Sequence, residues 1–489
     1  MLLRQNLIKR CTEVIILPQD FSKDFKSNIE LIDSRLRVNE SFDIVCRNFE
    51  FAQRKAKLYF VDGLVKDDSM VKVIQGVQAI TEDKLKNAPT ARNFVNQFIS
   101  YIETDVTGSI DVVTTMVLSG ALCIMIEGYE QAIIIDARTY PVRSVGEPEN
   151  DKVLRGAHDG FTETMIFNTA LLRRRMRNPQ LTVKYKNVGT LSHTDLVICY
   201  LDDKVDKKAL KSIEEKIDRV KIKNLPMGQA SLAEALLKKQ HFNPFPKIRY
   251  TERPDAAAAS INEGSIVIMV DNSPSAMIVP TGIFDFLQDS NDYYFPALIG
   301  SYLRIIRMLI FALTLLLTPV WLLLIQNESI IPPWLEFIKI QDEYLIPPFA
   351  QLLIVEIIID ALKLASLNTP SALSNSLSIV GALVLGEFAV QSGWLSSEVV
   401  LYMAFVGITN FTQPSYELGY AFKLCRMMMI VLIALFNLWG FIAGLLITTA
   451  LIAFNSTVTG RCYLYPLIPF DWQKLSGLLI RKRLNDKNN

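Results

Sequence analysis

Two carboxylates with helical spacing stand inside an apolar stretch of the chain. Glu356 and Asp360 lie four residues apart in segment 349–366, among Leu, Ile and Val. On a helix this spacing places both carboxylates on one face. A carboxylate at the centre of a bilayer costs roughly 2.5–3.5 kcal/mol. We therefore expect this face to meet water, a partner helix or an ion path; a helix lying in the membrane interface is the alternative.

Further apolar runs surround this segment and are long enough to begin or complete membrane spans. Their approximate limits are 303–325, 377–394, 397–412 and 427–454. They predict an all-α polytopic membrane domain over 301–460, followed by a cytoplasmic tail over 461–489. In that domain, segment 349–366 is expected to be an amphipathic or re-entrant helix.

Basic residues at the two ends of this domain predict its orientation. Arg304 and Arg307 precede the first apolar run, and Arg481-Lys-Arg483 follows the last. Both basic groups are expected on the cytoplasmic side, which requires an even number of crossings. Four spans satisfy this if 349–366 does not cross, although Lys423 and Arg426 then lie outside. Six spans satisfy it if 349–366 crosses and 417–454 divides into two.

A third acid, Glu387, lies within the apolar run 377–394. Together with Glu356 and Asp360 it is a candidate for an ion path. Such acids, repeated around the axis of an oligomer, attract cations and repel anions. The alternative for Glu387 is a protonated carboxyl group hydrogen-bonded to a neighbouring helix.

The first three hundred residues carry most of the charge and alternate between helical and strand patterns. Residues 121–128 and 131–136 are two apolar runs separated by a turn, which predicts a hairpin. The fold class is therefore a two-lobed α/β N-terminal region followed by the membrane domain. The lobes are expected at 1–140 and 179–300, joined by a hinge and a connecting helix over 141–178. No apolar run of signal-peptide length begins the sequence, so this region is expected to be cytoplasmic.

Polar residues near the hinge are candidates for a structural network between the lobes. The basic run 173–175 is expected to be a solvated face, to pair with acids of the other lobe, or to meet lipid headgroups. Arg253 is expected to reach Glu163 or Asp159 across the hinge, unless Asp255 simply caps the helix after Pro254. The network candidates are Arg155, Glu163, Arg173, Arg174, Arg253 and Asp255.

The sequence argues against several other classes of protein. Its six cysteines and three histidines are scattered without the spacing of metal ligands, so we expect no metal site. It contains no P-loop, GxSxG, HExxH or dinucleotide fingerprint, so we expect no catalytic residues, cofactor or enzyme activity. A net charge of +1 does not indicate nucleic-acid binding. A secondary transporter would need an internal repeat of the acidic segment, and a non-conducting scaffold stays open as an alternative.

Several motifs resemble the A subunit of the GerA-type spore germinant receptors of endospore-forming bacteria. The resemblance covers nearly the whole chain from about residue 30. They are Arg155-Gly156, Gly160-Phe161, Glu163, Asn168, Leu171-Leu-Arg-Arg-Arg175, Tyr250-Thr-Glu-Arg-Pro-Asp255, Glu263-Gly264, Asp271, Asp292-Tyr-Tyr294 and the stretch 379–390. Two places depart from the family pattern: Leu154-Arg-Gly-Ala-His158, and Leu362-Lys-Leu-Ala-Ser366 beside the expected ion path.

The resemblance implies a subunit of a nutrient receptor in the spore inner membrane. In that family the A subunit works with a transporter-like B subunit, which is the expected nutrient binder, and with a C lipoprotein. The resemblance further implies that the A subunit forms a homo-oligomer, a pentamer in the family, which opens as a nutrient-gated cation channel. It does not name the nutrient or locate the gate.

Overall fold

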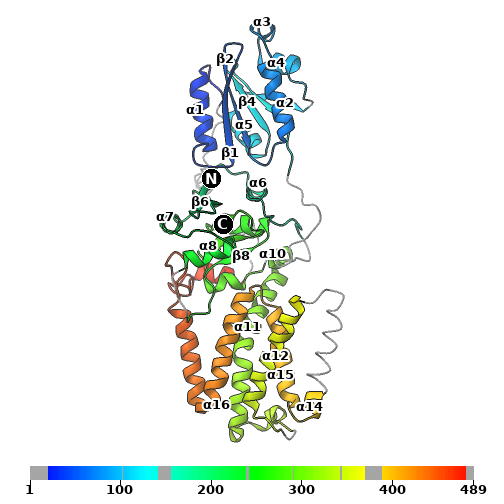
Figure 1. Cartoon of the computed structure of the whole chain (residues 1–489), viewed down its shortest axis with the longest axis vertical. Helices are drawn as coiled ribbons and strands as arrows, with labels where there is room; N and C mark the ends of the chain where they lie inside the picture. The colour runs from blue at the N-terminus through cyan, green and yellow to red at the C-terminus, as the bar shows by residue number, and fades with distance from the viewer. Residues whose placement is uncertain are drawn as a thin grey trace, which may run out of the picture. The chain divides into compact units, whose positions relative to one another are not determined.

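The computed structural model describes residues 20–480, apart from 102, 141–155, 238–241, 290, 342–343 and 369–387. The chain divides into two compact units, which are described separately (Figure 1). Unit 1 combines Met1–Lys152, Ala157–Leu236 and Tyr250–Val279. Unit 2 combines Val153–Gly156, Leu237–Arg249 and Pro280–Asn489.

The first lobe of unit 1 is a five-stranded antiparallel sheet in the order β1-β2-β4-β5-β3. Alternate residues of its central strand β4 enter different cores, as the two-residue period of a strand requires. Leu122 and Ile124 pack with α2 and α4 on one face, whereas Cys123 and Met125 pack with α1 and α5 on the other. The strands are β1 (Ile44–Phe51), β2 (Arg54–Val61), β3 (Thr104–Thr107), β4 (Leu122–Ile126) and β5 (Ala132–Ile135), and the helices are α1 (Phe25–Leu36), α2 (Asp67–Gln78), α3 (Glu82–Leu85), α4 (Ala91–Phe98) and α5 (Ile110–Leu118).

The second lobe of unit 1 is another five-stranded sheet, in the order β6-β7-β9-β10-β8. Helices α6 and α9 pack on one of its faces through Leu172, Ala257 and Ile261. Its elements are α6 (Met165–Arg175), β6 (Leu181–Val188), β7 (Thr194–Leu201), α7 (Lys207–Asp218), α8 (Gln229–Leu236), β8 (Arg249–Thr251), α9 (Pro254–Asn262), β9 (Ile266–Val270) and β10 (Ala276–Val279). Helix α6 lies where the connecting helix is expected within 141–178, and it contributes to the core of this lobe.

The two lobes repeat one topology. In each, a helix precedes two strands, helices lead to a third strand, and one helix leads to the last two strands. The spatial order of the strands is first-second-fourth-fifth-third in both sheets. The α/β class of both lobes was predicted from the sequence, but this repetition was not.

Local details of the backbone repeat as well. At the start of the first lobe, Asn28 hydrogen-bonds the N–H (2.9 Å) and the C=O (2.7 Å) of Ser22. In the second lobe Asn168 makes the same two bonds to Thr162, at 2.8 and 2.6 Å. Helices α5 and α9 are each followed within two residues by a glycine with positive φ, Gly120 (97°) and Gly264 (92°). Glycine is favoured there because a side chain is strained in this conformation.

Unit 2 is a bundle of long helices. They are α11 (Ala297–Gln326), α12 (Pro348–Asn368), α15 (Ser397–Phe411) and α16 (Tyr416–Ala453), with the shorter η2 (Ile283–Leu287), α10 (Asn291–Tyr294), η3 (Glu328–Ile330), η4 (Pro333–Ile338), α14 (Ala389–Gln391) and α17 (Trp472–Leu479). Among the described residues, α11 and α16 are long and apolar enough to cross a membrane. The expected span 377–394 falls mostly outside the described residues.

Helix α16 reverses direction at Asn437, whose φ of 51° and ψ of −127° are not helical. Its two halves then pack against each other. A Cβ on Gly440 would overlap the backbone of Leu432, and one on Gly444 would lie 2.7 Å from Met429 Cγ. The expected run 427–454 is therefore not one straight helix but most of a helical hairpin (Figure 1).

Contacts at the helix ends show the direction in which each helix runs. Asn327, after α11, exchanges hydrogen bonds of 2.6 and 3.0 Å with Asn437 at the hairpin turn. Gln351, in the first turn of α12, accepts a 2.8 Å bond from the N–H of Ser396, just before α15. Helix α12 continues for 21 residues, about 30 Å at 1.5 Å per residue. That length is sufficient for the hydrocarbon core of a bilayer, so α12 has the dimensions of a full span.

Candidate functional site

The candidate site is a cluster of ion pairs inside the helical bundle of unit 2. Glu356 of α12 is 1% exposed, and its carboxylate accepts a 2.8 Å hydrogen bond from Arg426 Nε. Lys423 Nζ lies 3.0 Å from Glu356 Oε2 and 2.6 Å from Asp360 Oδ2. Lys423 therefore bridges the two carboxylates that the sequence singled out.

Helical spacing on both partners produces this cluster. The acids are four residues apart on α12, and Lys423 and Arg426 are three apart on α16, so each pair projects from one face. Arg426 also donates a 2.6 Å hydrogen bond to the carbonyl of Thr314 in the middle of α11. The cluster thus connects three helices, and the side chains of Glu356, Lys423 and Arg426 are almost entirely buried.

The charges of the four named side chains of the cluster balance, with two carboxylates facing two cations, and Lys363 on α12 adds a positive charge close by. Removing ions from water costs several kcal/mol each, and that cost is offset only when the ions are paired and hydrogen-bonded. Glu356 and Arg426 meet this condition, because their side chains are 1% and 0% exposed and directly bonded. Asp360 differs, since 34% of its side chain is exposed.

Sequence reasoning identified the acids but missed their partners. In the sequence analysis, Lys423 and Arg426 were considered only because the four-span topology would place these basic residues on the outer side of the membrane. The signal that could have found them was the matched spacing of opposite charges on two apolar segments. The third ion-path candidate, Glu387, lies outside the described residues.

Arg173 carries the polar link between the two lobes of unit 1. Its side chain is 0% exposed, and its Nε and Nη2 donate to the carboxylate of Asp43 at 2.7 and 2.9 Å. Nη2 also lies 3.1 Å from Ser41 Oγ, and the neighbouring Phe42 N–H bonds the carbonyl of Val183 in β6 at 2.7 Å. Of the three alternatives for the arginine run, Arg173 follows the one in which it pairs with an acid of the other lobe.

The other network candidates have local partners. Arg174 is exposed and stacks on the ring of Tyr140 at 4.3 Å, while Arg175 pairs with Asp159. Arg253 lies at the N-cap of α9 and donates to Asp255 at 3.0 Å and to the carbonyl of Ala157 at 3.1 Å.

Two candidates contribute no described side-chain link between the lobes. Glu163 is exposed, and its backbone carbonyl accepts a 2.8 Å bond from Asn272. Arg155 lies outside the described residues.

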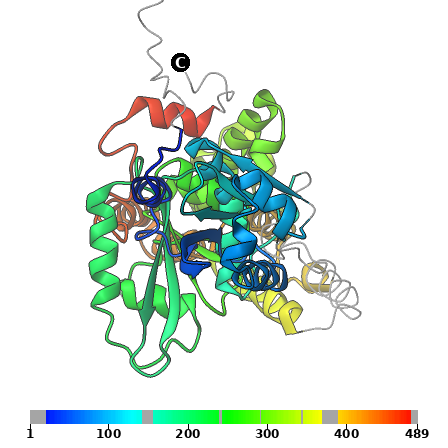
Figure 2. The same cartoon turned by 90° about the horizontal axis from the view of Figure 1, so that it is seen from above.

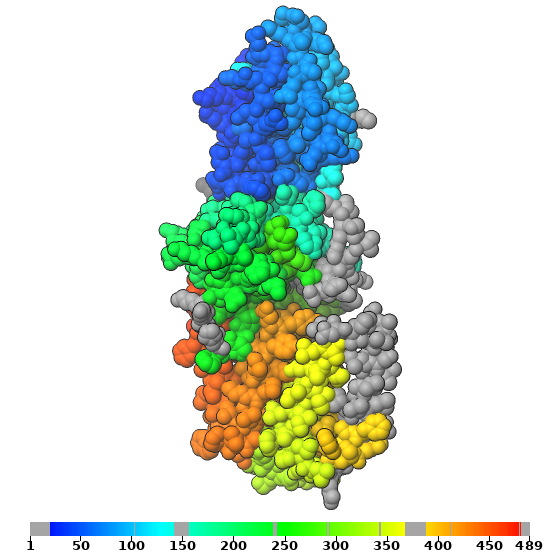
Figure 3. Space-filling view, in the orientation of Figure 1, coloured from blue at the N-terminus to red at the C-terminus, as the bar shows by residue number. Residues whose placement is uncertain are grey.

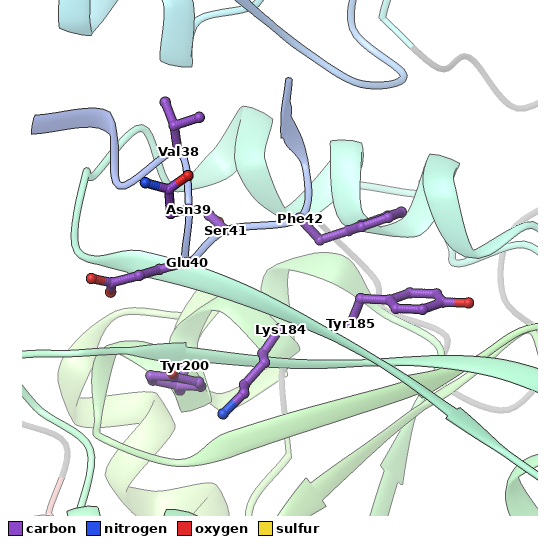
Figure 4. A pocket seen from close by; sticks show the side chains of 8 residues that line it. All are labelled: Val38, Asn39, Glu40, Ser41, Phe42, Lys184, Tyr185 and Tyr200. Atoms are coloured by element: carbon purple, nitrogen blue, oxygen red, sulfur yellow. The ribbon is translucent and has the colours of Figure 1, made fainter. Parts of the chain in front are cut away.

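A hollow of about 460 Å³ lies between the lobes of unit 1 (Figure 4). Its charged groups already have partners: Lys184 lies 2.8 Å from Glu214, and Glu40 pairs with Arg37. Burial raises the pKa of Tyr200 to about 12. The lining residues are Val38, Asn39, Glu40, Ser41, Phe42, Lys184, Tyr185 and Tyr200. In the part of the chain that the structure describes, no group of three or more His, Cys, Asp or Glu side chains could hold a metal ion.

Comparison with known proteins gives a consistent set of relatives. The chain is 35% identical to stage V sporulation protein AF of Bacillus subtilis (strain 168), over 93% of this chain and 92% of that protein. It is 26% identical to spore germination protein KA of the same organism, over 92% and 83% of the two chains. Spore germination protein A1 is 24% identical over 96% of each chain.

Among solved structures, the N-terminal domain of the A subunit of the Bacillus megaterium spore germinant receptor GerK3 covers 54% of this chain and 97% of its own. The TM-score is 0.42 and the sequence identity 22%. The family model described as Bacillus/Clostridium GerA spore germination protein matches residues 31–489. That match spans nearly the whole sequence, so the chain belongs to the GerA family of spore germination proteins.

Proposed function

We propose that this chain is a membrane subunit of a germinant receptor that assembles into a cation-conducting oligomer and so triggers spore germination. It resides in the spore inner membrane, with the N-terminal unit and the C-terminal tail in the cytoplasm. Its partners are further copies of itself, a transporter-like B subunit that binds the nutrient, a C lipoprotein and membrane lipids. Pentameric assembly and nutrient gating are the family's pattern and belong to the same proposal.

Tryptophans at the ends of the bundle support a membrane location. Trp334, Trp394 and Trp439 are 62–76% exposed and lie near the end marked by Asn327 and Asn437. Trp472 is 63% exposed and follows the opposite end of α16. Tryptophan gathers at both membrane–water interfaces, where its ring suits the headgroup level.

The course of the helices favours six crossings over four. Helix α16 supplies two legs, and α12 has the length of a full span. Helices α12 and α15 begin at the same end of the bundle. With the expected span 377–394, most of which lies outside the described residues, counted as a further crossing, the total is six, which keeps both termini of the membrane domain on one side.

The observation that carries the channel proposal is the partly exposed side chain of Asp360, which is 34% exposed although its carboxylate also pairs with Lys423. It lies midway along α12, the helix whose surface is yellow in Figure 3. Its neighbours Ile357, Ala361 and Leu364 on the same helix are exposed and apolar. A carboxylate on such a surface is unfavourable against lipid, so water or another subunit is its expected neighbour. Glu356 has a different place in the proposal, because its buried carboxylate holds α12 to α16.

The two acids can be separated by comparing Asp360→Asn with Glu356→Gln. We expect Asp360→Asn to reduce cation release from nutrient-treated spores at normal receptor abundance. Glu356→Gln should lower abundance, because breaking a buried ion pair costs about 3–5 kcal/mol. Release is measured by potassium efflux, and abundance by immunoblotting of the spore membranes. Normal efflux from Asp360→Asn spores with normal abundance would remove Asp360 from the ion path.

A non-conducting scaffold is the second candidate. It is favoured by the balanced charges of the cluster, which suit a structural joint between helices. Flux of cations through the purified complex in liposomes separates the two functions. A scaffold would assemble with its partners and conduct nothing, whether or not Asp360 is changed.

A further inference from the structure

The segment from Arg461 to Ile480, named here the tail anchor, exposes large apolar side chains. Residues of this kind are rarely gathered on a surface that faces water. Phe470 and Trp472 stack with ring centroids 6.3 Å apart. The exposed fractions are 42% for Leu467, 56% for Ile468, 68% for Phe470, 63% for Trp472 and 58% for Ile480.

Hydrogen bonds near both ends of the tail anchor hold it to the rest of unit 2. Near its start, the buried Tyr463 donates a 2.7 Å hydrogen bond to the carbonyl of Pro246 and accepts one of 3.0 Å from Ile283. Near its end, Arg304 of α11 donates a 2.8 Å bond to the carbonyl of Gly477 in the last turn of α17. The exposed side chains therefore belong to a fixed surface (α17 is red in Figure 2).

An apolar stripe on another face of α11 begins at the level of the tail anchor. Leu298, Tyr302, Ile305 and Leu309 follow at intervals of four, three and four residues, so they share one face of the helix. All four are exposed, by 53–83%. Arg304, which holds α17, lies within the same stretch, so the stripe begins at the level of the tail anchor and continues along the bundle.

The charge of the tail anchor complements an anionic surface. The tail anchor contains two basic residues, Arg461 and Lys474, and one acid, Asp471, and three more basic residues follow it in the sequence at 481–483. Arg461 and Lys474 both lie over the ring of Tyr465, at 3.6 and 5.2 Å from its centroid. The acid is engaged locally, because Asp471 caps α17 by accepting a 3.1 Å bond from the N–H of Lys474.

We infer that the tail anchor lies in the membrane interface and binds anionic phospholipid headgroups. Phe470 and Trp472 enter the level between headgroups and acyl chains, while Arg461 and Lys474 meet lipid phosphates. The anchor thereby fixes the cytoplasmic start of α11 relative to the bilayer. This inference rests on the membrane location in the proposed function.

The depth of Trp472 is the decisive measurement. The full chain is reconstituted in bilayers, and the emission of Trp472 is obtained by subtracting the spectrum of Trp472→Phe. We expect strong quenching by phospholipids brominated near the glycerol, weaker quenching by bromines near the chain ends, and little quenching by aqueous acrylamide. Trp321→Phe is the control, because the 3% exposed Trp321 should be protected from aqueous acrylamide.

Two results would overturn the inference. Efficient acrylamide quenching of Trp472 would place the tail anchor in water. Protection from both acrylamide and brominated lipids would mean that a protein, either another copy or a partner, covers it. If the chain is extracted from the bilayer by alkaline washing, the membrane location itself fails; if the chain is retained, only the depth of Trp472 is in question.

Headgroup recognition is tested with Lys474→Gln. A basic residue near an anionic surface contributes about 1 kcal/mol, a factor of about five in equilibrium preference. The preference of Trp472 quenching for brominated anionic over brominated zwitterionic lipid should fall by up to about fivefold. Lys86→Gln, in unit 1, is the matched control and should leave the preference unchanged. If Lys474→Gln leaves the lipid preference unchanged, Lys474 does not contact the lipid headgroups.

Discussion

The two lobes of unit 1 share one topology but use the same helical position differently. The ninth residue of the first helix is Asp33 in the first lobe and Arg173 in the second. Asp33 bonds Lys57 (2.6 Å) and Tyr59 (2.8 Å), two neighbours on β2 of its own sheet. Arg173 bonds Asp43, which belongs to the other lobe. The side chain at this position bonds within its own lobe in the first lobe, whereas in the second lobe it bonds a residue of the other lobe.

This difference shows which features the repeated fold requires and which can vary. The strand order, the asparagine bonds to the backbone and the glycines after α5 and α9 occur in both lobes. They satisfy the geometry of the backbone, which is the same in each copy. A buried polar side chain requires only that its partner be present. Such a position can therefore change its partner without changing the fold.

The largest expected loss of stability follows from removing the ion pair between Arg173 and Asp43, which links the two lobes. Arg173→Met leaves the Asp43 carboxylate buried without its cation, at a cost of about 3–5 kcal/mol. Hydrogen exchange of the purified full chain should show faster opening of both β1 and β6. The control is Arg174→Met, which removes an exposed neighbour stacked on Tyr140 and should cost less than about 1 kcal/mol. Equal effects of the two variants would contradict the assignment of the link between the lobes to Arg173.

A smaller loss of folding stability is expected when the repeated glycines, Gly120 and Gly264, are replaced. Gly120→Ala and Gly264→Ala each place a side chain at positive φ, at a cost of about 1–2 kcal/mol. The two losses should be similar, because the added Cβ would lie 2.8 Å from the backbone oxygen of Lys204 at Gly264 and 2.9 Å from Leu64 Cβ at Gly120. Thermal unfolding measures both. Gly76→Ala, inside α2 with nothing within 4 Å, should instead gain up to about 1 kcal/mol.

The asparagines provide a direct test of equivalence between the lobes. Asn28→Ala and Asn168→Ala each remove two hydrogen bonds to the backbone, so each should cost about 1 kcal/mol or slightly more. Urea unfolding of the two variants, compared with the double variant, measures the losses and their additivity. A loss confined to one lobe would show that the repeated geometry stabilises only that copy.

The smallest effect is a dependence on pH. The Arg138 guanidinium bonded to Asp136 in the first lobe holds the pKa of that carboxyl below its usual value. Lys207 lowers the pKa of Asp202 in the second lobe in the same way. A lowered folded pKa gives stability that is present above the unfolded pKa, about 4, and is lost as pH falls below that value and through the lower folded pKa. Asp136→Asn should lose less than about 1 kcal/mol at neutral pH, and acid titration should show a smaller dependence on pH.

Patterns along the sequence were sufficient for the α/β class of the lobes, because buried strands such as β4 and β9 are short apolar runs followed by turns. They did not show that the lobes repeat one topology. Few residues are shared, and the repeated features are backbone geometries at Asn28 and Asn168, or at Gly120 and Gly264. Such features become comparable only when the strands have been placed in space.

The candidate site was predictable in part for a similar reason. Glu356 and Asp360 were visible because charge inside an apolar helix is unusual. Their partners were not, because 67 residues separate Glu356 from Lys423. Pairing at that distance depends on how the helices pack, and the reversal at Asn437 is not marked by glycine or proline at the turn itself.

The separation of the paired charges also affects how the protein is made. Helix α12 leaves the ribosome with its carboxylates well before α16 supplies Lys423 and Arg426. An ionised side chain at the centre of an isolated helix is penalised by roughly 2.5–3.5 kcal/mol during insertion. Until α16 is synthesised, α12 is unstable in the bilayer, because its carboxylates lack the basic side chains that pair with them. On the proposed membrane location, biogenesis of this protein would therefore require a delay, in which the acidic helix remains at the insertion machinery or the membrane surface until its basic partner can enter beside it.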